Sequence, residues 1–215
     1  MQRRQLSDEV ASYLRQSIMA GELQPGASVR AEAVGEALDV SATPVREALH
    51  ALRAEGFLDL VPRKGFTVRA LTATDIRDIF EAHALIAGEL AARAARLITE
   101  DQAAELVRNH EQLMSAAERG DTPRLEHLND EFHRRVYLAS QSERLRWALG
   151  NFVKYVPTAF YEQIDGWPET TAEDHSAVCD AVVAHDAEAA RAAMSQHIRN
   201  AGEKLAGYFE GRQRA

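Results

Sequence analysis

Four side chains in the second half of the chain have the chemistry to hold a metal ion together. Asn129 and His133 are four residues apart, so on a helix they lie on one face. His175 and His197 follow in two further stretches of helical pattern. Imidazole nitrogens with an oxygen donor are common ligands of Zn²⁺, Ni²⁺ and similar ions. The alternative is that each is an ordinary surface or core residue, which a single helical histidine usually is.

A metal site of this type requires several helices that direct side chains inward, and the sequence predicts such helices. Beyond residue 74, apolar residues recur at helical spacing, and breaks such as Gly120-Asp121 divide them. About six helices with brief connections predict an antiparallel all-α bundle. The predicted helices cover residues 74–97, 100–120, 122–140, 143–160, 170–185 and 186–209.

Enzyme motifs are absent from the bundle sequence. It contains no glycine-rich phosphate loop and no HExxH, GxSxG or CxxC motif. We therefore expect a protein that is not an enzyme. The alternative is a metal-dependent hydrolase with an N-terminal interaction domain, since an asparagine and three histidines are also able to hold a catalytic ion. Against it, no carboxylate stands at a recognisable spacing to act as general base.

A second candidate site, rich in basic residues, lies in the first third of the chain. Ser41 or Thr43 is expected to cap a short helix that ends at Gly56. Two strands are predicted beyond it, at residues 57–61 and 66–68, around a basic turn of sequence PRKG. The buried stripe of the helix is expected to consist of Val45, Ala48, Leu49 and Leu52. Its basic side carries Arg46, His50 and Arg53.

The elements upstream of this helix predict how it is presented. The pattern indicates a helix over residues 7–20, a turn, a short strand at 28–29 and a second helix over 31–38. Asp39 is expected to take the left-handed conformation of the next tight turn. This order is that of a winged helix-turn-helix, whose recognition helix reads DNA beside a hairpin wing.

These patterns together predict a mainly α protein in two parts. We expect a winged helix-turn-helix DNA-binding domain over residues 1–70, a linker at 71–74 and the all-α bundle over 75–215. The net charge of −8 fits this division. Residues 1–70 hold nine of the 25 Lys/Arg and nine of the 33 Asp/Glu, so all the excess acid lies in the bundle.

Composition and hydropathy indicate the cellular compartment in which the protein is expected. No apolar run approaches the length that spans a bilayer, and no charged-then-apolar leader opens the chain. The single cysteine, Cys179, excludes an internal disulfide framework and fits a reducing environment. We therefore expect a cytoplasmic protein without a membrane partner.

Two motifs of the first part are specific. The heptapeptide TPVREAL at Thr43–Leu49 follows an upstream GELQPG at residues 21–26. Over residues 7–69 the chain resembles the DNA-binding domain of GntR-family bacterial transcription regulators. The resemblance implies that Arg46 contacts bases or adjacent phosphates, that Thr43 binds phosphate and that the Lys64-Gly65 tip enters the minor groove. The expected DNA contacts are Thr43, Arg46, His50, Arg53, Arg63, Lys64 and Gly65.

Three positions depart from that family's pattern. The family often has Arg, Glu and Gly where this chain has Ala42, Ala31 and Asp39. Without a basic residue at position 42, operator contacts should be weaker or different. We expect Arg46 and the Lys64-Gly65 tip to carry more of the contact. The opposite reading, a winged helix that is only a scaffold, predicts no salt-dependent DNA binding.

Three segments of the second part, FEAHALIAGELAARAA, NDEFH and EDHSAVCDAVVAHDAEAARAAMSQHI, look like the ligand-sensing FCD domain of FadR-type regulators, over about residues 75–210. The resemblance implies a divalent metal, Zn or Ni, held by Asn129, His133, His175 and His197. Neutral imidazoles and an amide leave the ion its full positive charge, which favours a carboxylate effector.

The effector site departs from the family at one position. The family often carries there an Arg that pairs with an anionic effector, and this chain has His83. We expect His83 to contact a small organic acid through one hydrogen bond; alternatively it is a buried helical residue. The resemblance further implies a homodimer on a double-stranded DNA operator, and a repressor that its effector releases.

Overall fold

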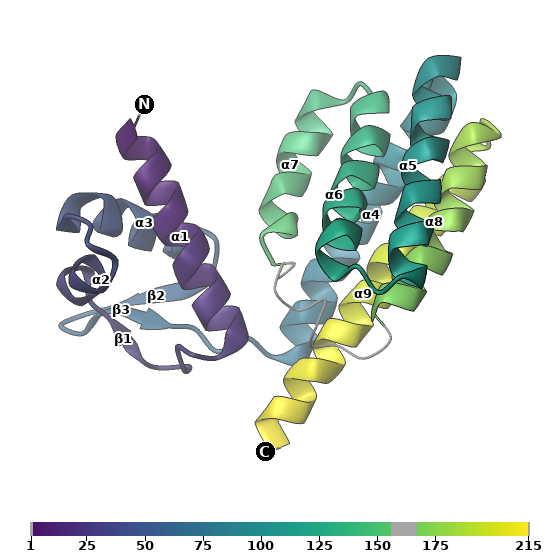
Figure 1. Ribbon diagram of the computed structural model, residues 1–215. Coiled ribbons are helices and arrows are strands. Elements are labelled where there is room, and N and C mark those ends of the chain that lie inside the picture. Colours follow the sequence, from purple (N-terminus) through teal and green to yellow (C-terminus); the bar gives the residue numbers. More distant parts are fainter. Residues whose placement is uncertain (1, 156–166, 215) are drawn as a thin grey trace. The chain divides into compact units, whose positions relative to one another are not determined.

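The computed structural model describes residues 2–155 and 167–214 and divides into two compact units, Met1–Leu71 and Thr72–Ala215. Over these residues the chain forms nine helices and one three-stranded sheet (Figure 1). The prediction of a mainly α protein, with a winged helix-turn-helix followed by about six helices, is confirmed.

The first unit is a winged helix-turn-helix. Its elements follow the predicted order, although the first helix begins five residues earlier than expected, because Gln and Arg favour the helix nearly as well as Ala. The elements are α1 (Gln2–Ala20), β1 (Ser28–Val29), α2 (Ala31–Leu38), α3 (Ala42–Ala54), β2 (Leu58–Val61) and β3 (Gly65–Val68).

The sheet and α3 share one small core. Strand β3 lies between β1 and β2, antiparallel to both, with Thr67 opposite Ser28 and opposite Asp59. The apolar stripe predicted for α3 is fully buried, which confirms the helical spacing argument. Phe57, between α3 and β2, is buried with it. Burial of one face of α3 leaves the opposite face, with its basic residues, at the surface.

The turn between α2 and α3 brings the backbone of Val40 close to Gly35. Asp39 takes the left-handed conformation, with φ 54°, as predicted. A Cβ on Gly35 would lie 2.5 Å from the Val40 carbonyl oxygen, so only glycine fits there. The predicted capping of α3 is only half right. Ser41 occupies the N-cap position, but its side chain makes no capping hydrogen bond, and Thr43 already lies inside the helix.

The second unit consists of α-helices (Figure 1). They are α4 (Ala73–Leu97), α5 (Glu100–Glu118), α6 (Thr122–Ala139), α7 (Glu143–Val153), α8 (Trp167–Val183) and α9 (Ala187–Arg214). The largest differences from the predicted boundaries are at α7, α8 and α9, and α9 runs to Arg214 where an end at residue 209 was expected. Helix α7 ends at Val153 and a turn follows, whereas a helix to residue 160 was expected; residues 156–160 lie outside the described part. Helix α8 begins at Trp167, because Pro168 is tolerated in a first turn.

Half of the linker predicted at residues 71–74 is helix. Thr72, not a later residue, is the N-cap of α4, and it forms a capping box with Asp75. The Thr72 hydroxyl accepts from the Asp75 backbone N–H at 3.1 Å, and the Thr72 N–H donates to the Asp75 carboxylate at 2.8 Å. The reciprocal pair satisfies two backbone donors at the helix start. Ala73 and Thr74 are therefore the first residues of α4.

Helices α4 and α9 run antiparallel and in close contact. Ion pairs join them along their length, from Arg77–Glu203 at 3.0 Å and Glu81–Arg199 at 2.6 Å to Arg96–Glu188 at 3.4 Å. The Ser195 hydroxyl donates to the Ala84 carbonyl at 3.0 Å, which needs the two backbones to be near each other. Gly88 on α4 and Gly202 on α9 permit this approach, because a Cβ at either position would clash with the other helix. The inward side chains of α9 therefore pack directly against α4.

Substitution of Gly202 by alanine is expected to destabilise the second unit by about 1–3 kcal/mol, as overpacking does. A Cβ there would lie 2.5 Å from the Phe80 Cβ on α4, where neither backbone can move away easily. Gly207→Ala is the matched control on the same helix, since its Cβ meets nothing within 4 Å. It should stabilise the helix by up to roughly 1 kcal/mol. Urea unfolding of both variants measures the difference, and equal midpoints would contradict the packing argument.

Among the described residues, no helix combines the length and the apolar character needed to cross a membrane.

Candidate metal centre and nucleic-acid interface

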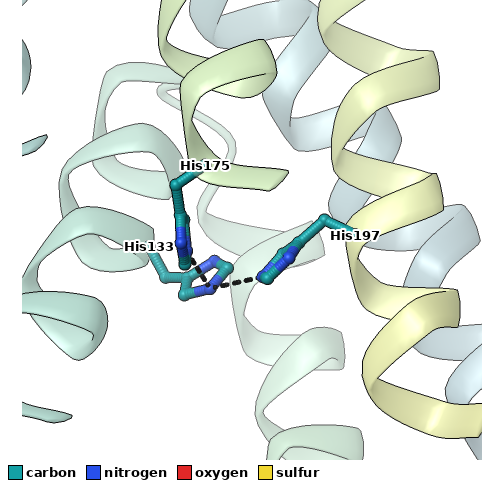
Figure 2. Close-up of side chains that lie close together, drawn as sticks. All are labelled: His133, His175 and His197. Carbon is teal, nitrogen blue, oxygen red and sulfur yellow. Dashed lines mark hydrogen bonds between the residues drawn. The ribbon is translucent and has the colours of Figure 1, made fainter. Parts of the chain in front are cut away.

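Three of the four predicted metal ligands come together. His133 on α6, His175 on α8 and His197 on α9 direct their rings at one point (Figure 2). The Nε2 atom of His133 lies 3.2 Å from the Nε2 atoms of both other rings. The ligand atoms of the group all lie within 4.8 Å of one another. Residues 64 positions apart in the sequence thus form one cluster of nitrogen donors.

The spacing of these nitrogens fits a shared ion. Two imidazole nitrogens bound to one Zn²⁺ at 2.0–2.1 Å, with tetrahedral angles, are about 3.3 Å apart. The observed 3.2 Å separations match this value. Without an ion, the lone pair of one neutral ring nitrogen would have to serve two neighbouring rings. The donor set and its geometry therefore fit a divalent metal.

The other ring nitrogen of His133 contacts Tyr137. The distance from Nδ1 to the Tyr137 hydroxyl is 3.3 Å, and that hydroxyl lies 3.9 Å from the Met194 sulfur, to which it donates. A hydroxyl that donates to sulfur is free to accept from the Nδ1–H of His133. Burial raises the pKa of Tyr137, so the hydroxyl stays protonated. This arrangement leaves Nε2 of His133 unprotonated and available to a metal.

A carboxylate that the sequence analysis missed supports His197. Its Nδ1 atom lies 3.4 Å from Oδ2 of Asp174, and the Asn200 amide donates to the same oxygen at 2.9 Å. Burial alone would raise the pKa of Asp174, but the hydrogen bonds from His197 and Asn200 outweigh it and lower the pKa. An ionised Asp174 holds the proton of His197 on Nδ1 and turns Nε2 toward the cluster. Its position directly before His175 was the only signal in the sequence.

The cluster lies mostly out of solvent, and this favours the neutral form of His133. His175 is fully buried, and His197 is 6% exposed. Desolvation, followed by the nearby His197 and His83, holds the pKa of His133 well below its ordinary value. Neutral rings are the form that binds metal.

The two remaining predicted site residues of the bundle are buried, each in a different setting. Asn129 lies one turn before His133 on α6, and its side chain is hydrogen-bonded to Asp130. His83 on α4 is only 4% exposed. Neither of its ring nitrogens has a hydrogen-bond partner among the described residues. Burial, with a smaller contribution from His197, lowers the pKa of His83 to about 4, so it carries no charge near neutral pH.

The residues predicted to contact DNA are exposed on two adjoining elements. Thr43, Arg46, His50 and Arg53 lie on the open face of α3. The hairpin between β2 and β3 exposes Arg63, Lys64 and Gly65 at its tip. The rings of His50 and Phe66 meet edge to face with centroids 5.1 Å apart, which joins the helix to the hairpin. Arg63 (φ 65°) and Gly65 (φ 78°) are left-handed, so the backbone turns back sharply at this tip.

An ion pair on this surface was not predicted. Arg46 donates from Nη2 to Oε1 of Glu32, the second residue of α2, at 2.7 Å. The two side chains are 64% and 69% exposed, respectively. The pair therefore stands in solvent, and Arg46 shares its exposed face of α3 with His50 and Arg53.

Comparison with known families decides the identity. Residues 78–200 match the FCD domain, and residues 6–68 match the bacterial regulatory proteins of the gntR family. The chain belongs to the GntR family. Its FCD domain contains all three clustered histidines, and its GntR domain contains the exposed basic face.

Curated relatives of this GntR regulator span nearly its whole length. The HTH-type transcriptional repressor RspR of Escherichia coli is 27% identical over 203 residues, covering 93% of this chain and 89% of RspR. A probable D-xylose utilization operon transcriptional repressor of Paenarthrobacter nicotinovorans is 29% identical, covering 90% of this chain and 85% of its own. Among solved structures, E. coli McbR/YncC superposes with a TM-score of 0.72 at 25% identity, covering 95% and 98% of the two chains.

This GntR-family chain is accordingly a ligand-responsive, DNA-binding transcriptional regulator and not an enzyme. The alternative of a metal-dependent hydrolase finds no support among its relatives.

Proposed function

We propose that this regulator represses transcription, that its FCD domain holds a divalent metal, and that a small organic acid bound beside the metal releases it from its operator. The observation that carries the proposal is the convergence of three Nε2 atoms inside the bundle, where that of His133 lies 3.2 Å from each of the other two. Such a group needs a cation or an unusual set of shared protons. The names of two relatives, both repressors, favour repression.

The metal ligands in this proposal are His133, His175 and His197, with Asn129 as a fourth, weaker donor; Zn or Ni suits this set. A bound ion would supply uncompensated positive charge that attracts a carboxylate. His83 is the neighbouring effector contact, because a neutral imidazole offers one donor and one acceptor. Its two unpartnered nitrogens cost about 1–3 kcal/mol each while buried, and an effector that pairs with them would recover part of that cost.

DNA recognition in this proposal uses the exposed face of α3 and the hairpin tip. Arg46 reads base edges in the major groove, and Lys64 with Gly65 enters the minor groove. Thr43, His50, Arg53 and Arg63 contact the adjacent phosphates or bases. A FadR-type homodimer would place two such faces on a pseudo-palindromic operator, and we place this regulator in the cytoplasm, where its operator lies.

The effector acts, on this view, through a difference in affinity. An organic acid that binds the metal-loaded bundle more tightly in the DNA-free conformation shifts the population toward that conformation. Linkage requires that operator DNA weaken effector binding by the same factor. Reciprocal titrations of the two ligands therefore test the coupling independently of any structure.

The proposed function is tested by a thermal-shift screen of small organic acids on Zn-loaded and on metal-stripped protein. An effector should raise the melting temperature only when the metal is present, since binding to the native state stabilises it. The same acid should lower affinity for operator DNA in fluorescence anisotropy. If the protein binds neither Zn²⁺ nor Ni²⁺, the proposed metal site is wrong. If an effector raises the melting temperature equally with and without metal, the effector does not bind at the metal.

Replacement of Asp174 by alanine is expected to weaken metal binding by roughly 10–100-fold, the usual effect of removing the partner of a ligating histidine. The reason is that Nδ1 of His197 loses the acceptor that fixes its tautomer. Asp180→Ala, an exposed acid on the same helix, removes equal charge without touching the cluster. Competition titrations with a chromogenic chelator measure both variants, and equal affinities would contradict the role of Asp174.

A further inference from the structure

Glu32 and Arg46 form an ion pair that the needs of folding do not explain. Their contact is 2.7 Å long, but both side chains are about two-thirds exposed. Exposed pairs of this kind contribute only about 0–1 kcal/mol to stability. The hydrogen bond to Arg46 is the largest cause that lowers the pKa of Glu32, so the carboxylate is ionised. A fixed negative charge thus stands within the surface that meets the polyanionic DNA.

We propose that Glu32 is a specificity-determining residue of the DNA-reading surface: it orients Arg46 on a guanine and accepts a hydrogen bond from a cytosine beside that guanine. This inference rests on the proposed role of α3 in reading DNA. Glu32 lies on α2, outside the helix that the family resemblance assigned to base contact.

The hydrogen-bonding capacity of the pair permits both contacts. Arg46 uses Nη2 toward Glu32, and a guanidinium has five N–H donors, so donors remain for O6 and N7 of a guanine. A carboxylate has about four lone-pair positions. Glu32 uses them for Arg46 and for its own backbone N–H, which anchors the carboxylate at the start of α2. Acceptor capacity is left for a base.

Cytosine is the base that the Glu32 carboxylate is expected to select. Its exocyclic N4 amine is a major-groove donor, and glutamate is the side chain that accepts from it. Successive bases of a strand are about 3.4 Å apart along the axis. Two side-chain atoms 2.7 Å apart therefore reach neighbouring steps. A carboxylate that found no donor would only be repelled by phosphates and would weaken binding to every sequence equally.

The test is in vitro selection from a random double-stranded DNA library, with full-length wild type, Glu32→Ala, Glu32→Gln and Glu36→Ala as the control. Glu36 is another exposed acid of α2. Wild type and control should select the same site, with a cytosine next to an invariant guanine. Glu32→Ala should keep the guanine, while its preference for cytosine falls from roughly tenfold or more to about even. Glu32→Gln should shift the preference toward adenine, because glutamine pairs with N6 and N7 of that base.

Each other outcome has a definite meaning. A site unchanged in Glu32→Ala, or affinity that rises equally for all sequences, overturns the base-reading role of Glu32. If the wild type selects no site at all, the proposed role of α3 in reading DNA is wrong. This result differs from a selected site that does not depend on Glu32, so the two failures are distinguished. Circular dichroism melts of the variants should match wild type, since Glu32 is solvent-exposed and its loss leaves no cavity.

Discussion

His133→Ala is expected to abolish metal binding at concentrations that saturate the wild-type protein. His133 is the central member of the cluster, since its Nε2 atom is the one that lies 3.2 Å from both other rings. Removal of a supporting residue around a metal costs about 10–100-fold, and removal of a ligand should cost more. Isothermal titration with Zn²⁺ measures the loss. The thermal shift that Zn²⁺ gives the wild type should vanish with it.

The matched control for this variant is His127→Ala. His127 lies on the same helix, α6, but is exposed and belongs to no histidine cluster of the described residues. The His127→Ala variant should leave both the metal affinity and the effector response unchanged. DNA binding by His133→Ala without effector should persist, because the altered residue lies in the other compact unit. Undiminished Zn²⁺ binding by His133→Ala would show that the cluster is not the metal site.

Arg46→Ala should weaken specific operator binding by about 1–3 kcal/mol for each recognition helix, as loss of a base-contacting arginine does. In the proposed homodimer, which would place two helices on one operator, the cost should be larger still. Affinity for unrelated DNA should change much less, since base contacts supply specificity and phosphate contacts supply the general affinity. Anisotropy titrations against operator and scrambled duplexes at a fixed salt concentration give both values.

The control for this variant must remove a positive charge elsewhere. Arg108→Ala serves, because Arg108 is exposed on α5 in the other unit. If it reduced operator affinity as much as Arg46→Ala, the effect would be one of net charge rather than of base reading. Equal losses on operator and scrambled DNA would lead to the same conclusion.

Much of the fold was predictable because local rules and tertiary packing agree. The stripe of α3 and the left-handed Asp39 follow from spacing and turn chemistry, and both are observed. The boundaries were less predictable. Thr72 caps α4 because Asp75, three residues later, pairs with it, whereas the helix was expected to begin at residue 74. The end of α7 at Val153 has no comparable breaker in the sequence before Pro157.

The site was predictable to the extent that periodicity assigns faces. The four-residue spacing of Asn129 and His133 placed both on one face of α6, and His133 meets histidines of two other helices. Side chains that distant segments bring beside the site residues were not predictable from the sequence. Asp174 and Glu32 look like ordinary helical acids, and only the packing of α8 on α9 and of α2 on α3 places them beside His197 and Arg46. Similarly, nothing local indicated that His83 would be buried without a hydrogen-bond partner.

The close packing of α4 on α9 has a mechanical consequence. Gly202 leaves no gap against Phe80, and ion pairs at Arg77 and Glu81 tie the same two helices. A helix held this way transmits a displacement along its axis instead of absorbing it. Helix α9 carries His197, and α4 begins at Ala73, two residues after Leu71, so a shift of one ring at the cluster acts, within the second unit, on a helix pair that extends to the first turn of α4.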